Sequence, residues 1–282
     1  MKRLLLILVI FVPQLTAAIA PVAAQTFVLN PYSVVSGDVE AAAFITAAGI
    51  TDPTQQTAIN NFVASLKTAN IWTKMLAVYP FVGGTATSHK FNLKDPRDLD
   101  AAFRLVYVGT GNTHSAAGFF AANGGYADTK FVPLTNLASN TFTFGLKLTG
   151  NPDLTAKDMM GASGTPVDSW FFLNYQTTNF NASISGNNAT STVTPNANLI
   201  SGSTNGTNIR AWVGGTQDGS SSWSGSRTSF SVYLGKRNAS GSVNGTASMT
   251  FQFAYIAQPE LTSSEMAALN TAVVNLQTAL GR

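Results

Sequence analysis

The chain contains no cysteine and few charged residues, and both scarcities limit what it can do. None of its 282 residues is cysteine and only 10% are charged, against about 25% in an average globular domain. The missing thiols exclude disulfides, thiolate chemistry and cysteine-bound metals. With so little charge, the surface must be built from Ser, Thr, Asn, Gln and Gly, a composition suited to β-rich proteins outside cells.

Neither sign of charge dominates. The formal net charge is +3, and without Lys2 and Arg3, which lie in a predicted leader, 14 basic residues face 13 acidic ones. No basic stripe runs along the sequence, so nothing favours a nucleic acid as partner. Aromatic residues are plentiful, with 18 Phe, 7 Tyr and 4 Trp. They supply ample material for a core and argue against disorder.

The first 24 residues have the three parts of a secretory signal. A charged start, Met1-Lys2-Arg3, precedes an apolar run at residues 4–12, and Val22-Ala23-Ala24 fits a small-residue cleavage site. The alternative is an uncleaved membrane anchor, but the strictly apolar run has only nine residues, against about 20 in a spanning helix. We therefore expect residues 1–24 to be removed, leaving a secreted or surface-exposed chain with no stable membrane span.

Residues 25–80 are expected to form an extended segment followed by a helical module. Apolar residues recur at helical spacing over residues 38–48. A second helix begins at Asp52-Pro53, with the aspartate as cap and the proline in the first turn. Residues 71–79 are interpreted as a third short helix that ends before a proline.

Residues 81–282 are expected to form a β-sandwich domain. Several segments alternate apolar with small or polar residues, which is the period of a strand. They are residues 142–148, 169–175, 209–213, 229–234 and 249–256. The Ser-, Thr-, Asn- and Gly-rich segments 183–208 and 214–226 are interpreted as long loops at the ends of the sandwich.

The C-terminal segment predicts a helix that packs on this domain. Thr262 and Glu265 form a capping box. One apolar stripe follows, made of Met266, Leu269, Val273, Leu276 and Leu280. Such a stripe needs a partner surface. We expect packing within the chain and keep a partner subunit as the alternative.

Several runs of the sequence are similar to one protein family. The stretch AAFITAAGITDPTQQTAINNFVASLKTANIWTKMLAVYPFVGG, the segment NLKDPRDLDAAFRL, the run GGYADTKFVP and the closing LQTALGR resemble virion or tail-associated proteins of tailed phages and prophages. The resemblance covers residues 38–135 and the C-terminal 30 residues. It implies a mainly β fold, a concanavalin A-like (lectin/glucanase, laminin G-like) or jelly-roll sandwich, and a structural role. It assigns no catalytic residue.

The acids and histidines are too few and too scattered for hydrolysis. A glucanase of this fold needs two carboxylates on one strand face. The only glutamates, Glu40, Glu260 and Glu265, lie on or beside predicted helices. The only histidines, His89 and His114, lie in Ser-, Thr- and Gly-rich loops. We interpret them as surface or loop-bracing residues rather than as bases of a triad, and we expect no enzyme activity.

Asp95, Asp98 and Asp100 form an acidic cluster in the run KDPRDLD. Oxygen ligands of this kind can hold Ca²⁺. The spacing is not that of an EF-hand loop, and Lys94 and Arg97 supply counter-charges within the run. We interpret the cluster as an ion-paired turn, with calcium as the alternative. No cofactor is expected.

A glycan site is the binding hypothesis that this composition allows. Lectin sites place an aromatic face beside Asn, Asp and Gly loops, because a sugar has an apolar face and hydroxyl edges. Trp212, Trp223, Tyr233 and Asp218 lie in or near such loops. Trp223, flanked by serines on both sides, is expected to be exposed to solvent and is the first candidate.

The sequence thus favours a non-enzymatic structural or adhesive protein displayed on a virion or cell surface. The alternative is a carbohydrate-binding, lectin-like module for host or matrix attachment, and a glycoside hydrolase is least favoured. Expected partners are glycans or other structural subunits, including further copies of the chain. An exposed aromatic beside a concave polar site would favour glycans, and a flat apolar face would favour assembly.

Overall fold

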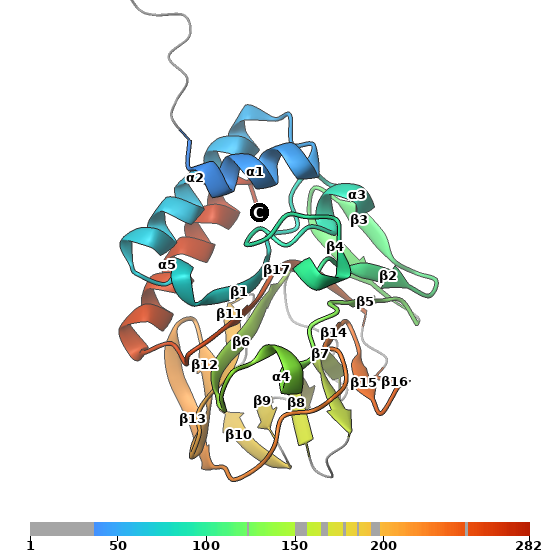
Figure 1. Cartoon of the computed structure of the whole chain (residues 1–282), viewed down its shortest axis with the longest axis vertical. Helices are drawn as coiled ribbons and strands as arrows, with labels where there is room; N and C mark the ends of the chain where they lie inside the picture. The colour runs from blue at the N-terminus through green and yellow to red at the C-terminus, as the bar shows by residue number, and fades with distance from the viewer. Residues whose placement is uncertain are drawn as a thin grey trace, which may run out of the picture. The chain divides into compact units, whose positions relative to one another are not determined.

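The computed structural model describes residues 37–122, 124–149, 157–164, 169–176, 179–184, 186–192, 198–245 and 248–282 (Figure 1). The predicted signal peptide, residues 1–24, lies outside the described residues. Residues 37–282 cluster into one unit, so the elements below belong to a single body. Within the part of the chain that is described, no helix is long and apolar enough to cross a membrane.

The first helices begin at the residues that the sequence marks. The Asp38 carboxylate accepts from the backbone N–H groups of Glu40 and Ala41, and Gly49 ends the helix with a φ of 64°. Asp52 caps the second helix in the same way. The described helices and helical turns are α1 (Val39–Ala48), α2 (Pro53–Thr68), η1 (Trp72–Lys74), α3 (Ala86–His89), η2 (Asp100–Ala102), α4 (Pro133–Asn136) and α5 (Ser263–Ala279).

The C-terminal helix α5 is confirmed together with its capping box. The backbone N–H of Thr262 donates to Glu265 Oε2 at 2.9 Å, and the backbone N–H of Glu265 donates to Thr262 Oγ1 at 3.3 Å. Met266, Leu269 and Leu276 of the apolar stripe are buried. They pack with residues of α1, α2 and the first sheet, so the helix packs within the chain as expected. Figure 1 shows α1, α2 and α5 grouped on one side of the strands.

The strands form two sheets, antiparallel except where β15 pairs with β7. The first, with eight strands, has the order β13-β12-β11-β6-β17-β4-β3, and β1 also pairs with β17. The second, with nine strands, has the order β10-β9-β8-β7-β14-β5-β2, and β15 and β16 extend it. The bounds are β1 (Met75–Tyr79), β2 (Val106–Val108), β3 (Thr113–Ser115), β4 (Gly118–Ala121), β5 (Tyr126–Asp128), β6 (Thr141–Leu148), β7 (Lys157–Gly164), β8 (Ser169–Gln176), β9 (Asn179–Ile184), β10 (Asn187–Ser191), β11 (Leu199–Asn205), β12 (Asn208–Val213), β13 (Thr216–Ser222), β14 (Tyr233–Leu234), β15 (Arg237–Ala239), β16 (Ser242–Asn244) and β17 (Met249–Ala257).

Residues 71–79 do not form the helix that we predict. After the single turn η1, the chain enters β1, which pairs antiparallel with β17. Ala77 and Tyr79 are buried between the sheets, and Val78 is buried beneath the helices. A short run that is apolar on both faces has no period that separates strand from helix. Pairing with a strand near the other end of the chain decides the outcome.

Both polar segments predicted as long loops contain strands. β10 and β11 fall within residues 183–208, and β13 falls within residues 214–226. β11 is paired on both sides, by β6 and β12, and its Ser201 and Ser203 are fully buried. Small hydroxyl side chains show no apolar alternation, so the pattern hides strands that their neighbours stabilise. Conversely, the strand predicted at residues 229–234 shortens to β14.

Two apolar layers hold these elements together in a concanavalin A-like or jelly-roll sandwich. The inter-sheet core lies between the sheets and includes Phe119, Phe142, Phe144, Phe171, Phe180, Ile209, Ala211 and Trp223. The helix-side core lies between the first sheet and α1, α2 and α5, and includes Phe44, Phe62, Leu66, Trp72, Trp212, Phe253, Tyr255 and Leu276. Because side chains alternate along a strand, neighbours such as Ala211 and Trp212 enter different layers.

Candidate functional site

Trp223, the first candidate of the sequence, is not exposed. Its side chain is 4% exposed and lies in the inter-sheet core. The backbone N–H of Trp223 donates to the carbonyl of Thr207 at 2.7 Å, so the β12–β13 ladder continues beyond Ser222. This register puts Trp223 on the same face as the core residue Ile209. The prediction of an exposed ring is therefore wrong, because pairing that the serine-rich sequence does not reveal turns the ring inward.

Tyr233 lies on the second sheet, in β14. Its ring stacks on that of Tyr126, with centroids 4.4 Å apart. Burial, followed by the neighbouring Tyr126 and Asp128, raises the pKa of Tyr233 to about 12. The phenol is therefore neutral at physiological pH, and its ring is largely covered by Tyr126 and the sheet.

Asp218 connects the edges of the two sheets. It is the extra residue of a bulge in β13, between Gly219 and the next paired residue. Its Oδ2 accepts from Ser191 Oγ and from the backbone N–H of Thr192, both at 2.6 Å. A Cβ on Gly219 would lie 2.3 Å from the carbonyl oxygen of Thr190, so β13 and β10 are in close contact. The structure thus gives Asp218 a bracing role.

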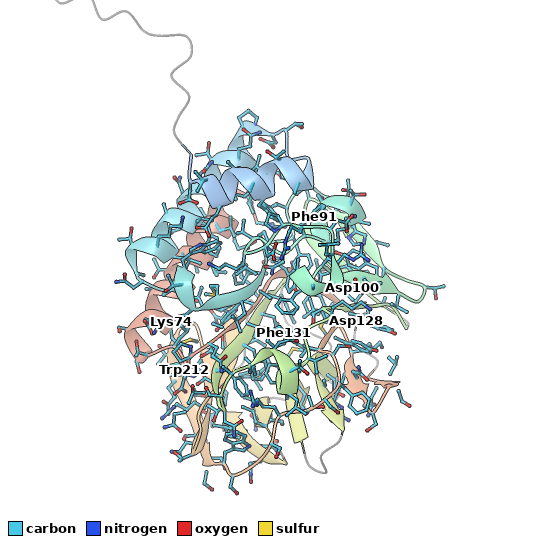
Figure 2. All side chains as sticks on the ribbon, viewed as in Figure 1. Lys74, Phe91, Asp100, Asp128, Phe131 and Trp212 are labelled. Carbon is cyan, nitrogen blue, oxygen red and sulfur yellow. The ribbon has the colours of Figure 1, made fainter. Side chains whose placement is uncertain are left out.

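Trp212 does lie at a pocket. A cavity of about 330 Å³ opens beside the start of α5, near the lower end of the range for small-molecule sites, roughly 300–1,000 Å³. Its lining residues are Arg210, Trp212, Gln217, Glu260, Leu261, Thr262 and Ser263. We call this cavity the Glu260 pocket. Figure 2 shows Trp212 and Lys74 on the side of the molecule where α5 begins.

A chain of hydrogen bonds orients Glu260. Arg210 Nη1 and Ser203 Oγ both donate to Glu260 Oε1 at 2.6 Å. Ser203 Oγ also accepts from Trp212 Nε1 at 2.8 Å. A serine hydroxyl has one proton, so the indole N–H leaves that proton free to point at the carboxylate. The carboxylate is thus positioned before any ligand arrives.

The β12–β13 hairpin supplies one wall of the pocket. Arg210 and Trp212 stand two apart on β12, so both face the helices. Gly214 and Gly215 connect the strands with φ values of 59° and 81°, the two positive values that a tight hairpin turn requires. A Cβ on Gly215 would lie 2.9 Å from backbone atoms of α5. The hairpin tip can therefore rest directly against that helix.

The segment between β17 and α5 supplies the opposite wall and is anchored at both ends. The backbone N–H of Leu261 donates to Thr143 Oγ1 at 2.9 Å. Lys74 Nζ donates to both carboxylate oxygens of Glu265, at 2.6 and 2.7 Å, and fixes the first turn of α5. Glu260 lies between Leu261 and Gln258, whose backbone N–H donates to the Lys74 carbonyl at 2.8 Å, so its backbone has little freedom to move.

The pocket can donate and accept hydrogen bonds around a single carboxylate. Of the described residues that line it, Glu260 is the one acid. Arg210 and Gln217 add N–H donors, hydroxyls come from the start of α5, and Trp212 and Leu261 add apolar surface. This mixture suits a hydroxyl-rich ligand. Sequence reasoning missed Arg210, Gln217 and Glu260, and the available signal was an isolated arginine two residues from a tryptophan on a predicted strand.

The acidic cluster of the sequence forms ion pairs, as we interpret it. The pairs are Asp95–Arg97, Asp98–Lys90, Asp98–Arg104 and Asp100–Arg104. Lys90 and Arg104 hold the pKa of Asp98 below its ordinary value. Lys94 does not pair with any of these aspartates; its Nζ lies instead 3.8 Å from Glu40 Oε1. Among the residues that the structure describes, no group of three or more His, Asp or Glu side chains is arranged to hold a metal.

The two histidines of the chain meet between α3 and β3. The Nδ1 atoms of His89 and His114 lie 3.0 Å apart. His89 is 1% exposed, and its Nε2 has no hydrogen-bond partner among the described residues. An unpartnered buried acceptor is less costly than an unpartnered N–H, so we assign the His89 proton to Nδ1, donating to His114. Burial, then His114 and Arg282, lowers the pKa of His89 to about 3. His89 is thus a buried bracing residue, not a surface one.

No family model matches the chain, and no curated protein sequence matches it. Solved structures do. Domain 4 of an extracellular GH43 arabinanase from Geobacillus stearothermophilus, in complex with arabinotriose, is 14% identical with a TM-score of 0.50, over 70% of this chain and 98% of that one. The binding domain of botulinum neurotoxin serotype D is 8% identical with a TM-score of 0.51, over 72% of this chain and 52% of that one.

A third similar structure is that of botulinum neurotoxin type C, whose cell entry depends on interaction with two ganglioside molecules. It is 9% identical with a TM-score of 0.52, over 73% of this chain and 53% of that one. This chain therefore spans about half the length of the toxin domains. At such identities the likeness shows the fold, and the neighbours are β-sandwich binding domains.

Proposed function

We propose that this chain is an extracellular, non-catalytic β-sandwich module that binds a glycan in the Glu260 pocket. The observation that carries the proposal is the hydrogen-bonded chain Trp212–Ser203–Glu260–Arg210, with both bonds to Glu260 at 2.6 Å. Sugar hydroxyls donate and accept at once. A carboxylate and a guanidinium oriented in advance offer both partners without the cost of ordering them on binding.

The similar structures support a glycan as the ligand class. The arabinanase domain was solved with arabinotriose, and the type C toxin interacts with gangliosides. The likeness lies in the fold, so the assignment to this chain rests on its own pocket. The pocket also differs from the site expected from the sequence, because its tryptophan, Trp212, is buried and presents no exposed indole face.

Catalysis is not part of the proposal. Hydrolysis of a glycoside uses two carboxyl groups on either side of the scissile bond. Glu265, the acid next to the pocket in the sequence, is held by Lys74 and caps α5. Glu260 therefore serves as a hydrogen-bond acceptor. The role we infer is adhesive, on a virion or cell exterior, and the resemblance to tailed-phage virion proteins remains a prediction within it.

A panel of immobilised oligosaccharides tests the proposal. The full chain should bind at least one glycan, and Gln217→Ala should raise its Kd about threefold to tenfold, since one neutral hydrogen bond contributes about 0.5–1.5 kcal/mol. Gln217 is exposed on β13, so the fold should tolerate the change. Ser222→Ala, exposed on the same strand outside the pocket, is the matched control. Absence of binding to every glycan would refute the proposed function.

A further inference from the structure

We infer that the Glu260 pocket selects uncharged sugars with two neighbouring hydroxyls and rejects glycans that place a carboxylate or sulfate in it. The inference rests on the proposed function and names the ligand class of the same site. It follows from how the charges of the pocket are paired and from which polar atoms the pairing leaves open.

The charges around the pocket cancel one another. The side chains of Arg210 and Glu260 are 23% and 15% exposed, with 2.6 Å between nitrogen and oxygen. An anion that took Arg210 for itself would leave Glu260 without a counter-charge in a partly buried site, which is unfavourable. The neighbouring pair of Lys74 and Glu265 is equally balanced. Of the described cations at this end of α5, none lacks a carboxylate partner, so nothing attracts an anion.

A vicinal diol fits the atoms that remain. Ser203 and Arg210 both bond to Oε1 of Glu260, whereas its Oε2 has no hydrogen-bond partner among the described residues. The guanidinium has five N–H donors and uses one of them on Glu260. One hydroxyl of a diol can donate to Oε2 while its neighbour accepts from Arg210. Two adjacent hydroxyls thereby bond to the pair without separating it.

Paired glycans distinguish the two ligand classes. The full chain is titrated by calorimetry with a neutral glycan that it binds on the panel, and with a counterpart carrying a carboxylate or sulfate, at low and high NaCl. We expect the neutral ligand to bind at least about tenfold more tightly, because the acidic group disrupts a partly buried ion pair. Its Kd should change by less than about twofold with salt, since no net charge is paired. Tighter, salt-sensitive binding of the acidic counterpart overturns the inference and leaves the proposed function standing.

The variant Glu260→Gln gives opposite results for the two classes. It keeps the shape of the side chain and removes its charge. An uncharged diol loses its charged acceptor and should bind at least about tenfold more weakly. An anion would bind more tightly, because Arg210 is released. A gain of affinity for acidic glycans in this variant accompanied by unchanged neutral binding therefore contradicts the inference.

A matched control separates these effects from general destabilisation. Asp158→Asn breaks a comparably buried pair with Arg237 on the second sheet, where the side chains are 13% and 19% exposed, and should leave every Kd unchanged. If Glu260→Gln does not fold, Gln217→Ala reports on the same pocket. Neutral binding that neither pocket variant weakens overturns the inference, because the ligand then lies elsewhere. Failure to bind any glycan refutes the proposed function itself.

Discussion

The β12–β13 hairpin ladder carries two buried tryptophans whose surroundings differ. Trp212 faces the helices and donates its Nε1–H to Ser203. Trp223 faces the other sheet, and its Nε1–H has no partner among the described residues. Burying an indole removes roughly 200 Å² from water, which stabilises by ~5 kcal/mol at ~25 cal/mol per Å². That gain exceeds the cost of one unmet N–H, about 1–3 kcal/mol.

The difference shows that the burial of a tryptophan does not by itself decide whether the residue can serve a binding site. On the inter-sheet side, the free energy gained by burying the apolar ring is the larger effect, and the indole N–H can remain without a partner. On the helix side, the Trp212 N–H, the Ser203 hydroxyl and Oε1 of Glu260 each have a partner, and Oε2 of that carboxylate is left for the pocket. Three substitutions, at Trp223, His89 and Ser203, test this contrast.

Trp223→Ala should have the largest effect. It leaves a cavity in the inter-sheet core, so the free energy of unfolding should fall by about 3–5 kcal/mol. Urea denaturation measures this loss. Trp223→Phe should lose less, because it fills part of the space and removes the unmet N–H. A loss under about 1 kcal/mol for the alanine variant would mean that the ring is not part of the core.

Burial of His89 beside the inter-sheet core should make the stability of the fold depend on pH. Its ring meets Phe81 of the inter-sheet core edge-on, and its folded pKa of about 3 lies below the ordinary value of 6.5. Below about pH 6.5 the His89 imidazole is protonated in the unfolded chain and stays neutral in the folded chain. Stability present above that pH is therefore lost, at ~1.4 kcal/mol per pH unit, until about pH 3.

Urea denaturation near pH 7.5 and near pH 5 checks this expectation. The wild type should lose on the order of 2 kcal/mol more between the two pH values than His89→Phe does. This window lies above the range in which most carboxylates titrate. An equal loss in both proteins would show that His89 accepts its proton in the folded state.

Ser203→Ala should have a smaller effect, on the helix side. It leaves the Trp212 N–H without a partner and takes one donor from Glu260. We expect the free energy of unfolding to fall by about 1–3 kcal/mol and glycan affinity to weaken with it. Ser222→Ala, exposed on β13, should stay within about 0.5 kcal/mol of the wild type. Unchanged stability and affinity in Ser203→Ala would show that the chain of bonds does not position Glu260.

The sequence predicts the helices of this fold better than its polar strands, for a physical reason. Caps such as Asp38, Asp52 and Thr262 act on backbone groups two or three residues away, so the signal is local. β10, β11 and β13 consist largely of Ser, Thr, Asn and Gly and become strands through pairing with distant segments. The helix predicted at residues 71–79 is wrong for the same reason, because residues 75–79 pair with β17 near the other end of the chain.

The pocket was beyond sequence reasoning for a related reason. Arg210 and Glu260 are 50 positions apart and meet because the turn after β17 brings the acid over β12. Arg210 and Glu260 do not belong to any sequence motif that would have predicted a binding site. Trp212 was a candidate and does line the pocket, but it is only 3% exposed and its N–H is donated to Ser203, so it offers no open face. The orientation of such side chains depends on register, which alternation reveals only where apolar residues mark it.

The contact between β13 and β10 bears on how separate molecules of this protein meet. The outermost strand of a sheet offers unpaired backbone groups to which another chain can add, and many proteins place lysines there to prevent it. β13 and β10 end their sheets, and their residues include no lysine. Gly219 against Thr190 and the carboxylate of Asp218 close this edge instead. A protein with a sparsely charged surface thereby blocks strand addition by steric closure.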